Sequence, residues 1–301
     1  MSASIALQYT AMCLIWGLSW IAIKTAVDVV PPLFFAACRF LIAGGVLFAL
    51  ARWRGSRLPD DAPWGRIAVA ALLINTGCYA TLFWGMQYVP SGFAGVINLS
   101  LIPITLFALG IFFGQERFTR TRAAALTLGI AGLLVLMRER LAVELSPMAV
   151  PGSIAVIAAT FSYALGSVLS RPLLERVPSL SLAAVHNVIG GLGLAVLSFA
   201  FETIDASTLR AMATAPVLAS LAFLVFCASL VAFTVYLKLL RDWGPYQAGT
   251  YAFVSPIIAV AVGMAWAGER YSVFELVGAI LMLVAVGMSL RPARRAQEAT
   301  H

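Results

Sequence analysis

Ten apolar runs, separated by short polar breaks, divide the chain almost from end to end. A bilayer core about 30 Å thick needs about 20 apolar residues in a helix that crosses it, and each run has roughly this length. The pattern therefore predicts an all-α membrane protein with ten transmembrane helices. We expect them at 4–24, 33–52, 66–88, 93–113, 121–138, 149–170, 181–201, 214–237, 247–267 and 273–290. No break is long enough for a second, soluble domain.

One apolar pattern occurs twice. The stretch LIPITLFALGIFFGQER, residues 101–117, returns 153 positions later as VSPIIAVAVGMAWAGER, residues 254–270, without a gap. Chemically matching residues occupy equal places in the two copies: Pro103 and Pro256, Gly110 and Gly263, Glu116 and Glu269. Because each half holds five spans, an odd number, the second half must enter the membrane from the opposite side. We expect two inverted five-helix repeats, 1–140 and 141–301, the second ending in a short basic cytoplasmic tail.

The loop charges predict the orientation. Fourteen Lys and Arg residues fall in the loops on one side and five in the loops on the other. Cytoplasmic loops carry the excess of Lys and Arg, so both termini are expected to be cytoplasmic. Glu116 then lies at the cytoplasmic face and Glu269 at the outer face. The first run lacks a basic leader and is expected to be a retained span.

Composition agrees with a membrane location. The chain is 61% hydrophobic and only 11% charged, with a mean hydropathy of +0.95, whereas a soluble domain carries about a quarter charged residues. The net charge of +7 comes from short arginine clusters between apolar runs, which favours topology signals over nucleic-acid binding. The four cysteines fall inside apolar runs without zinc-type or CxxC spacing, so we expect core packing and no metal or cofactor.

Three short motifs resemble those of a known family. They are IWGLSWIAIK in the first span and the repeated endings P…GQER and P…AGER, the first copy departing at Gln115 where Gly268 stands in the second. They resemble the drug/metabolite transporter superfamily in its EamA-type, ten-helix branch, and over nearly its whole length the chain is most similar to the bacterial aromatic amino acid exporters. The resemblance implies export of Phe, Tyr, Trp or related compounds across the inner membrane by alternating access. A multidrug or other metabolite efflux transporter of the same fold stays open as an alternative.

Aromatic and polar residues at mid-depth predict a substrate cavity. Asn98 and its repeat partner Tyr251 lie at matching depth, and Asn75, Tyr79 and Phe83 recur every four residues on one face. Such a lining suits a flat apolar solute with a polar end. Hydrogen bonding between helices is an equal alternative for the polar groups, and packing or lipid contact is favoured for any single ring. The substrate-binding candidates are Trp16, Trp20, Asn75, Tyr79, Phe83, Asn98, Phe161, Tyr163 and Tyr251.

Prolines and glycines mark expected bending points. Pro103 and Pro256 each remove a backbone donor in mid-span, and Gly110 and Gly263 follow seven residues later. We expect the third, fourth, eighth and ninth spans to bend alternately around a fixed site.

Four ionisable residues have two interpretations each. Arg39, inside the second span, either attracts a substrate carboxylate or, as we favour, snorkels to the outer edge. His186 is either a proton switch or, as favoured, a packed or capping imidazole. Glu116 and Glu269 either form contacts that break on opening or, as favoured, are ordinary surface charges. No Asp or Glu occupies the middle of a span, which predicts facilitated transport without proton coupling.

Other classes of protein fit less well. A membrane-embedded enzyme would need a GxSxG motif or clustered His and carboxylate residues, and the chain has neither, with His186 and His301 as its two histidines. Short loops disfavour a receptor, and nothing resembles a channel filter. We therefore expect no catalytic residues, a small-molecule substrate and the lipid bilayer as partners, and a working monomer, because the two halves already supply the symmetry.

Overall fold

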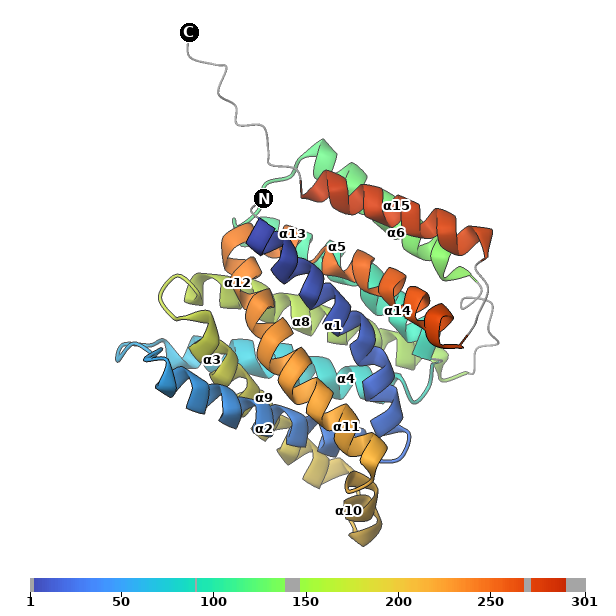
Figure 1. The fold of residues 1–301 in the computed structure, drawn as a ribbon. Coiled ribbons are helices and arrows are strands. Elements are labelled where there is room, and N and C mark those ends of the chain that lie inside the picture. The colour runs from blue at the N-terminus through green and yellow to red at the C-terminus, as the bar shows by residue number, and fades with distance from the viewer. Residues whose placement is uncertain (1–2, 90, 139–146, 268–271, 291–301) are drawn as a thin grey trace.

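The computed structural model describes residues 3–89, 91–138, 147–267 and 272–290, and every regular element in these stretches is a helix (Figure 1). Ten helical segments of 17 residues or more coincide with the ten predicted spans. In chain order they are α1 (Ala3–Val27), α2 (Pro32–Trp53), the composite Trp64–Gly85, α5 (Ser91–Phe112), α6 (Arg120–Leu136), α8 (Ala149–Leu173), α9 (Ser179–Phe201), the composite Ala215–Trp243, α14 (Tyr251–Ala267) and α15 (Val273–Ser289).

The helices have the lengths and surfaces of membrane spans. Seven of those described are long and apolar enough to cross a bilayer, while α6, α14 and α15 are shorter, with 17 residues each. Large apolar side chains such as Leu7, Val196 and Phe199 are about seven-tenths exposed. A protein that covers itself with such residues is stable only in lipid, so the chain is a multi-pass membrane protein.

The two composite spans share an irregularity. The third span consists of α3 (Trp64–Ala71), the π-helical segment η1 (Leu72–Gly77) and α4 (Cys78–Gly85). The eighth, its counterpart in the second half, consists of α11 (Ala215–Phe223), the π-helical segment η2 (Leu224–Ala232) and α12 (Phe233–Trp243). A π-helix has more residues per turn than an α-helix. The side chains that follow each π-segment therefore point in other directions than a regular α-helix would give them.

The contacts between helices of the two halves come in matching pairs. α2 packs along α9, and α6 packs along α15, so the second and fifth spans each pair with their counterparts (Figure 1). α1 packs against α14 and the eighth span, whereas α8 packs against α5 and the third span. Each of these contacts therefore has a partner contact with the two halves interchanged.

The ends of α2 and α9 are tied together. The Glu202 carboxylate accepts hydrogen bonds from the backbone N–H groups of Leu33 and Phe34, both at 2.8 Å. At the opposite end, the hydroxyls of Ser56 and Ser181 are hydrogen-bonded at 2.8 Å. A carboxylate at a helix N-terminus satisfies free N–H groups and complements the helix dipole, so these contacts fix how α2 and α9 align.

Matching caps begin the last helix of each half. Thr119 accepts a hydrogen bond from the backbone of Arg122 at the start of α6, and Ser272, 153 positions later, caps α15 in a capping box with Glu275. Two short helices, α10 (Ala206–Met212) and α13 (Pro245–Ala248), lie in connections.

Candidate functional site

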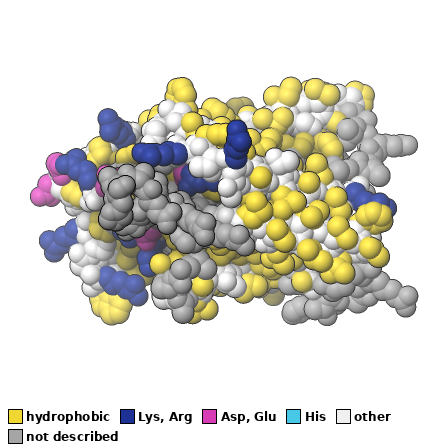
Figure 2. Space-filling view, turned by 90° about the horizontal axis from the view of Figure 1, so that it is seen from above, with side chains coloured by type: hydrophobic (Ala, Val, Ile, Leu, Met, Phe, Trp, Pro, Cys, Tyr) yellow, Lys and Arg dark blue, Asp and Glu magenta, His cyan; other side chains and the backbone are white. Residues whose placement is uncertain are grey.

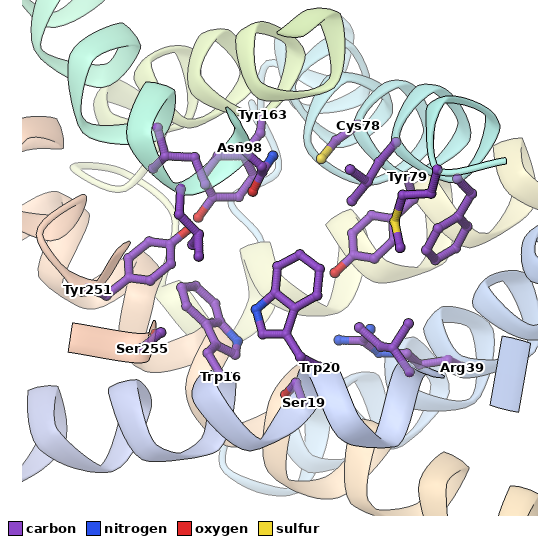
Figure 3. Close-up of a pocket in the computed structure, with 16 residues that line it drawn as sticks. Trp16, Ser19, Trp20, Arg39, Cys78, Tyr79, Asn98, Tyr163, Tyr251 and Ser255 are labelled. Atoms are coloured by element: carbon purple, nitrogen blue, oxygen red, sulfur yellow. The ribbon is translucent and has the colours of Figure 1, made fainter. Parts of the chain in front are cut away.

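A cavity of about 130 Å³ opens among the spans near their middle (Figure 3). Its wall comes from both halves of the chain: α1, α2, α4 and α5 of the first, and α8 and α14 of the second. Apolar and aromatic side chains make up most of the lining, and a few polar groups interrupt it. This is the composition expected of a site for a small amphipathic molecule.

Seven of the nine predicted substrate residues line this cavity. They are Trp16, Trp20, Tyr79, Phe83, Asn98, Tyr163 and Tyr251. Figure 3 shows the two indoles in the centre, Tyr79 on one side, and Tyr251, Asn98 and Tyr163 on the other. The Asn98 amide also donates to the Thr160 hydroxyl at 2.9 Å. Asn98 therefore both lines the cavity and forms a hydrogen bond between helices, the two roles that were alternatives for the polar groups.

Asn75 does not line the cavity. Its amide is buried and donates to the backbone oxygen of His186 at 3.0 Å, joining the third span to α9. The predicted stripe assumed regular α-helix from Asn75 to Tyr79. The π-segment η1 changes the register between these residues, so Tyr79 and Phe83 face the cavity while Asn75 faces α9.

Phe161 also lies away from the cavity. Its side chain is 48% exposed on the outer surface of α8, in contrast to the lining residue Tyr163. Residues two positions apart in an α-helix point in directions about 200° apart, so Phe161 and Tyr163 cannot lie on the same face of α8. The spacing itself contained this information, and the prediction of both as lining residues was wrong for Phe161.

Several lining residues were not predicted. They are Ser19, Ile23, Cys78, Leu82, Met86, Leu99, Ile102 and Ser255. Helical spacing identifies some of them, because Ser19 and Ile23 extend the stripe of Trp16 and Trp20, and Ser255 lies one turn beyond Tyr251. Ile102 and Ser255 are also 153 positions apart, so the repeat relates them as it relates Asn98 and Tyr251.

An aromatic cluster lies against one end of the cavity. The Trp16 ring meets Tyr251 edge-on with centroids 4.4 Å apart and lies 5.3 Å from the ring of Tyr236. Tyr236 is fully buried and donates its hydroxyl to Ser167 at 2.9 Å. These close ring contacts hold the indole of Trp16 in the cavity wall.

Arg39 lies in the cavity wall. Its side chain is 5% exposed, its Nε donates to the Ser229 hydroxyl at 3.1 Å, and its guanidinium lies 4.7 Å from the ring centroid of Phe40. The favoured interpretation, snorkelling to the outer edge, is wrong because the side chain turns inward and is held there. Among the described residues, Arg39 is the one charged group in the lining, and no Asp or Glu joins it.

His186 is packed inside the protein. It is completely buried on α9, its ring lies 6.2 Å from that of Phe233, and it does not line the cavity. Neither ring nitrogen has a hydrogen-bond partner among the described residues. This position agrees with the favoured interpretation of a packed imidazole.

Glu116 holds together several elements at the end of α5. Its side chain is 4% exposed, its Oε2 accepts from Arg122 at 2.5 Å, and its Oε1 accepts from the backbone N–H of Tyr246 at 3.1 Å. The favoured interpretation as an ordinary surface charge is therefore wrong for Glu116. Its repeat partner Glu269 lies outside the described residues.

The predicted bending points lie within helices. Pro103 is inside α5 and Pro256 inside α14, and Gly263 is also part of α14. Gly110 packs so closely on Glu116 that an added Cβ would lie 2.7 Å from its Cγ. A role of these residues in bending stays a prediction. The described residues form no His, Cys, Asp and Glu group suited to a metal ion.

The chain is similar to known membrane transporters in sequence and to a solved structure in fold. The model of the EamA-like transporter family matches residues 4–138 and 150–291. The uncharacterized inner membrane transporter YedA of Escherichia coli is 29% identical, over 94% of this chain and 91% of YedA. A probable amino-acid metabolite efflux pump of Salmonella typhimurium is 27% identical, over 89% of each chain. A solved crystal structure at 22% identity covers 98% of this chain with a TM-score of 0.81, which shows the fold alone.

Proposed function

The chain belongs to the EamA-like transporter family, and we propose that it moves aromatic amino acids or related small amphipathic metabolites across the inner membrane by alternating access. The observation that carries this proposal is the aromatic-lined cavity between the two halves. Indole and phenol rings bind flat solutes through stacking and edge contacts, and the few polar groups orient them. The family is one of transporters, so the chain is not an enzyme.

The proposed mechanism uses two inverted repeats, 1–140 and 141–301. Two observations support this division: the family model matches the chain twice, once in each half, and the helix contacts between the halves come in matching pairs. Two similar halves of opposite orientation can adopt each other's conformations, which opens one central site alternately to either side. Pro103 and Pro256 are the proposed bending points in matching spans.

The proposed orientation has both termini in the cytoplasm. Figure 2 shows most of the visible Lys and Arg side chains gathered toward one end of the molecule, which supports it. In this orientation Trp20, Ile23 and Met86 lie toward the outer ends of their spans, so the cavity extends outward. The Glu116 contacts then close the cytoplasmic end.

We further propose that movement follows the solute gradient without proton exchange. Proton-coupled carriers use an ionisable carboxyl group inside the membrane that binds and releases the proton. The described lining contains no Asp or Glu, and the buried His186 lies outside it. These observations support facilitated transport, and the two halves, which already supply the symmetry, are the reason for proposing a monomer.

Uptake into liposomes tests the proposal. Purified protein in liposomes is expected to move radiolabelled Phe, Tyr and Trp saturably, faster than Leu and Lys, and independently of an imposed pH gradient. Movement of hydrophobic drugs but of no amino acid would transfer the assignment to a multidrug efflux transporter. Empty liposomes give the background.

A pair of tryptophan variants links uptake to the cavity. Trp20→Ala removes a ring from the lining and is expected to lower the initial rate of aromatic uptake about tenfold. Trp53→Ala removes the same ring from a position that is 81% exposed and should leave the rate near that of the wild type. Equal effects of the two changes would contradict the proposed site.

A further inference from the structure

The two ends of the cavity differ in chemistry (Figure 3). At one end the guanidinium of Arg39 points into the space beside Trp20 and Tyr79. At the other end stand three neutral polar side chains: Asn98, Tyr163 and Ser255. The hydroxyls of Tyr163 and Ser255 are buried there without a hydrogen-bond partner among the described residues. The indoles of Trp16 and Trp20 lie between these two ends.

Arg39 has an unused capacity to bind an anion. The bond from its Nε to Ser229 is the one hydrogen bond that it makes to the described residues, so both terminal nitrogens lack a partner there. No described carboxylate forms an ion pair with it. An unpaired cation inside a transmembrane span has an unfavourable free energy. Such groups in transporters pair with a substrate or with a second charge.

The guanidinium is held in a fixed direction. The Ser229 hydroxyl anchors Nε at 3.1 Å, and the aromatic rings of Phe40 and Tyr79 have centroids 4.7 Å and 5.7 Å from Cζ. Because these contacts leave the two terminal nitrogens without a described partner, the guanidinium can donate two parallel hydrogen bonds to a carboxylate. A group already held in its binding orientation loses little entropy when the anion binds.

We propose that Arg39 binds the carboxylate of the transported solute, and that the solute is an aromatic carboxylate with a hydrogen-bonding substituent on its ring. The indoles of Trp16 and Trp20 hold the ring, and the neutral polar end binds the substituent. Since no described acidic residue lines the cavity, an amino group on the solute is not required for binding. The inference rests on the proposed function and specifies the substrate class of the same cavity.

Binding of a matched ligand series tests the assignment. Isothermal titration calorimetry on the purified full-length protein compares L-tyrosine, L-tyrosine amide, 3-(4-hydroxyphenyl)propionate and tyramine. The two carboxylates are expected to bind at least about tenfold more tightly than the amide and the amine, because charge-assisted hydrogen bonds are the strong ones. Hexanoate and hexanamide form a second pair in which the ring is absent.

Variants assign the preference to Arg39. In Arg39→Gln the ratio of carboxylate to amide affinity should fall to about one, while the exposed Arg210→Gln should keep the wild-type ratio. The ratio is measured within one preparation, so a merely structural role of Arg39 would not change it. Should Arg39→Gln fail to fold, Ser229→Ala keeps the cation but removes its anchor, and the ratio should fall several-fold.

The outcomes separate the inference from the proposed function. Equal binding of carboxylates and amides, or an unchanged ratio in Arg39→Gln and Ser229→Ala, overturns the inference and leaves aromatic transport standing. A carboxylate preference that needs Arg39 but is equal for hexanoate and the aromatic acids supports the anchor and overturns the aromatic assignment. The absence of binding by every ligand overturns both.

Discussion

At the scale of single residues, Glu116 is a buried charge that joins several elements. Its carboxylate joins the end of α5 to α6 through Arg122 and to α13 through the Tyr246 backbone. Gly244, at φ +88°, brings the backbone so close that an added Cβ would lie 2.4 Å from Glu116 Oε1. The contact thus crosses from the first half of the chain to the second.

We predict that Glu116→Gln lowers the free energy of unfolding by about 2 kcal/mol, because a charge-assisted hydrogen bond is lost and Arg122 is left without its partner. Reversible unfolding in SDS measures the change. The matched control is Asp61→Asn, which breaks the Arg176 pair between side chains that are 67% and 71% exposed. That change should cost less than about 0.5 kcal/mol. Equal losses in both variants would mean that Glu116 is an ordinary surface charge.

The limits of sequence reasoning are also clearest at single residues. Helical spacing and the repeat were sufficient to predict Trp16, Trp20 and Tyr251 as lining residues, because regular helix converts spacing into direction. The inward turn of Arg39 was not predictable, since it depends on Ser229, which is 190 positions away in the sequence. A residue's depth can be estimated from its own span, but its direction depends on partners from other spans.

At the scale of elements, the contact between α2 and α9 rests on small residues. An added Cβ on Gly44 would lie 2.6 Å from the Cγ2 atom and 2.9 Å from the backbone nitrogen of Val188. On the neighbouring Gly45, nothing lies within 4 Å of an added Cβ. In membranes, such close approach of helix backbones is a main source of association, because the surrounding lipid is as apolar as the side chains.

We predict that Gly44→Ala destabilises the protein by about 1–3 kcal/mol, since the backbone of α9 must move to admit the methyl group. Gly45→Ala should be neutral or stabilising by up to about 1 kcal/mol, because alanine is the better helix former and its methyl group meets nothing. SDS unfolding of the two variants makes the comparison. A loss in Gly45→Ala as large as that in Gly44→Ala would contradict close packing as the cause.

Element positions were predicted well and element irregularities were not. Each apolar run corresponds to a helix, since a buried backbone in lipid must satisfy its hydrogen bonds within the helix. The π-segments η1 and η2 carry no comparable signal, because neither LLINTG nor LVFCASLVA contains a proline that would mark an irregular helix. The effect of η1 was the wrong direction predicted for Asn75.

At the scale of the whole molecule, the duplication explains why much of the architecture was predictable. A repeat offset of 153 relates Pro103 to Pro256, the caps Thr119 and Ser272, and two pairs of lining residues. The halves also differ, since the position of Arg122 corresponds to Glu275 in the second copy. The basic partner of Glu116 thus has no basic counterpart at the matching position of the second copy. In the proposed orientation, this difference favours a cytoplasmic end that is closed more firmly than the outer one.

The orientation and the number of crossings are tested by the same pair of cysteines. Arg57 lies between the second and third spans, and Arg210 on α10 lies between the seventh and eighth. Five predicted spans separate them, among them the short α6, whose 17 residues reach about 25 Å and need slight thinning of the bilayer to cross it. An odd number of crossings requires the two positions to lie on opposite sides.

In intact spheroplasts, a membrane-impermeant maleimide should therefore label Arg210→Cys, while Arg57→Cys reacts only after the membrane is disrupted. The four native cysteines lie within spans, and the unsubstituted protein supplies their background. The opposite pattern would keep an odd number of crossings between the two positions but reverse the orientation, moving the Glu116 closure to the outer side. Labelling of both cysteines from the same side would mean that one of the five helices does not cross, and the inverted repeat would then fail.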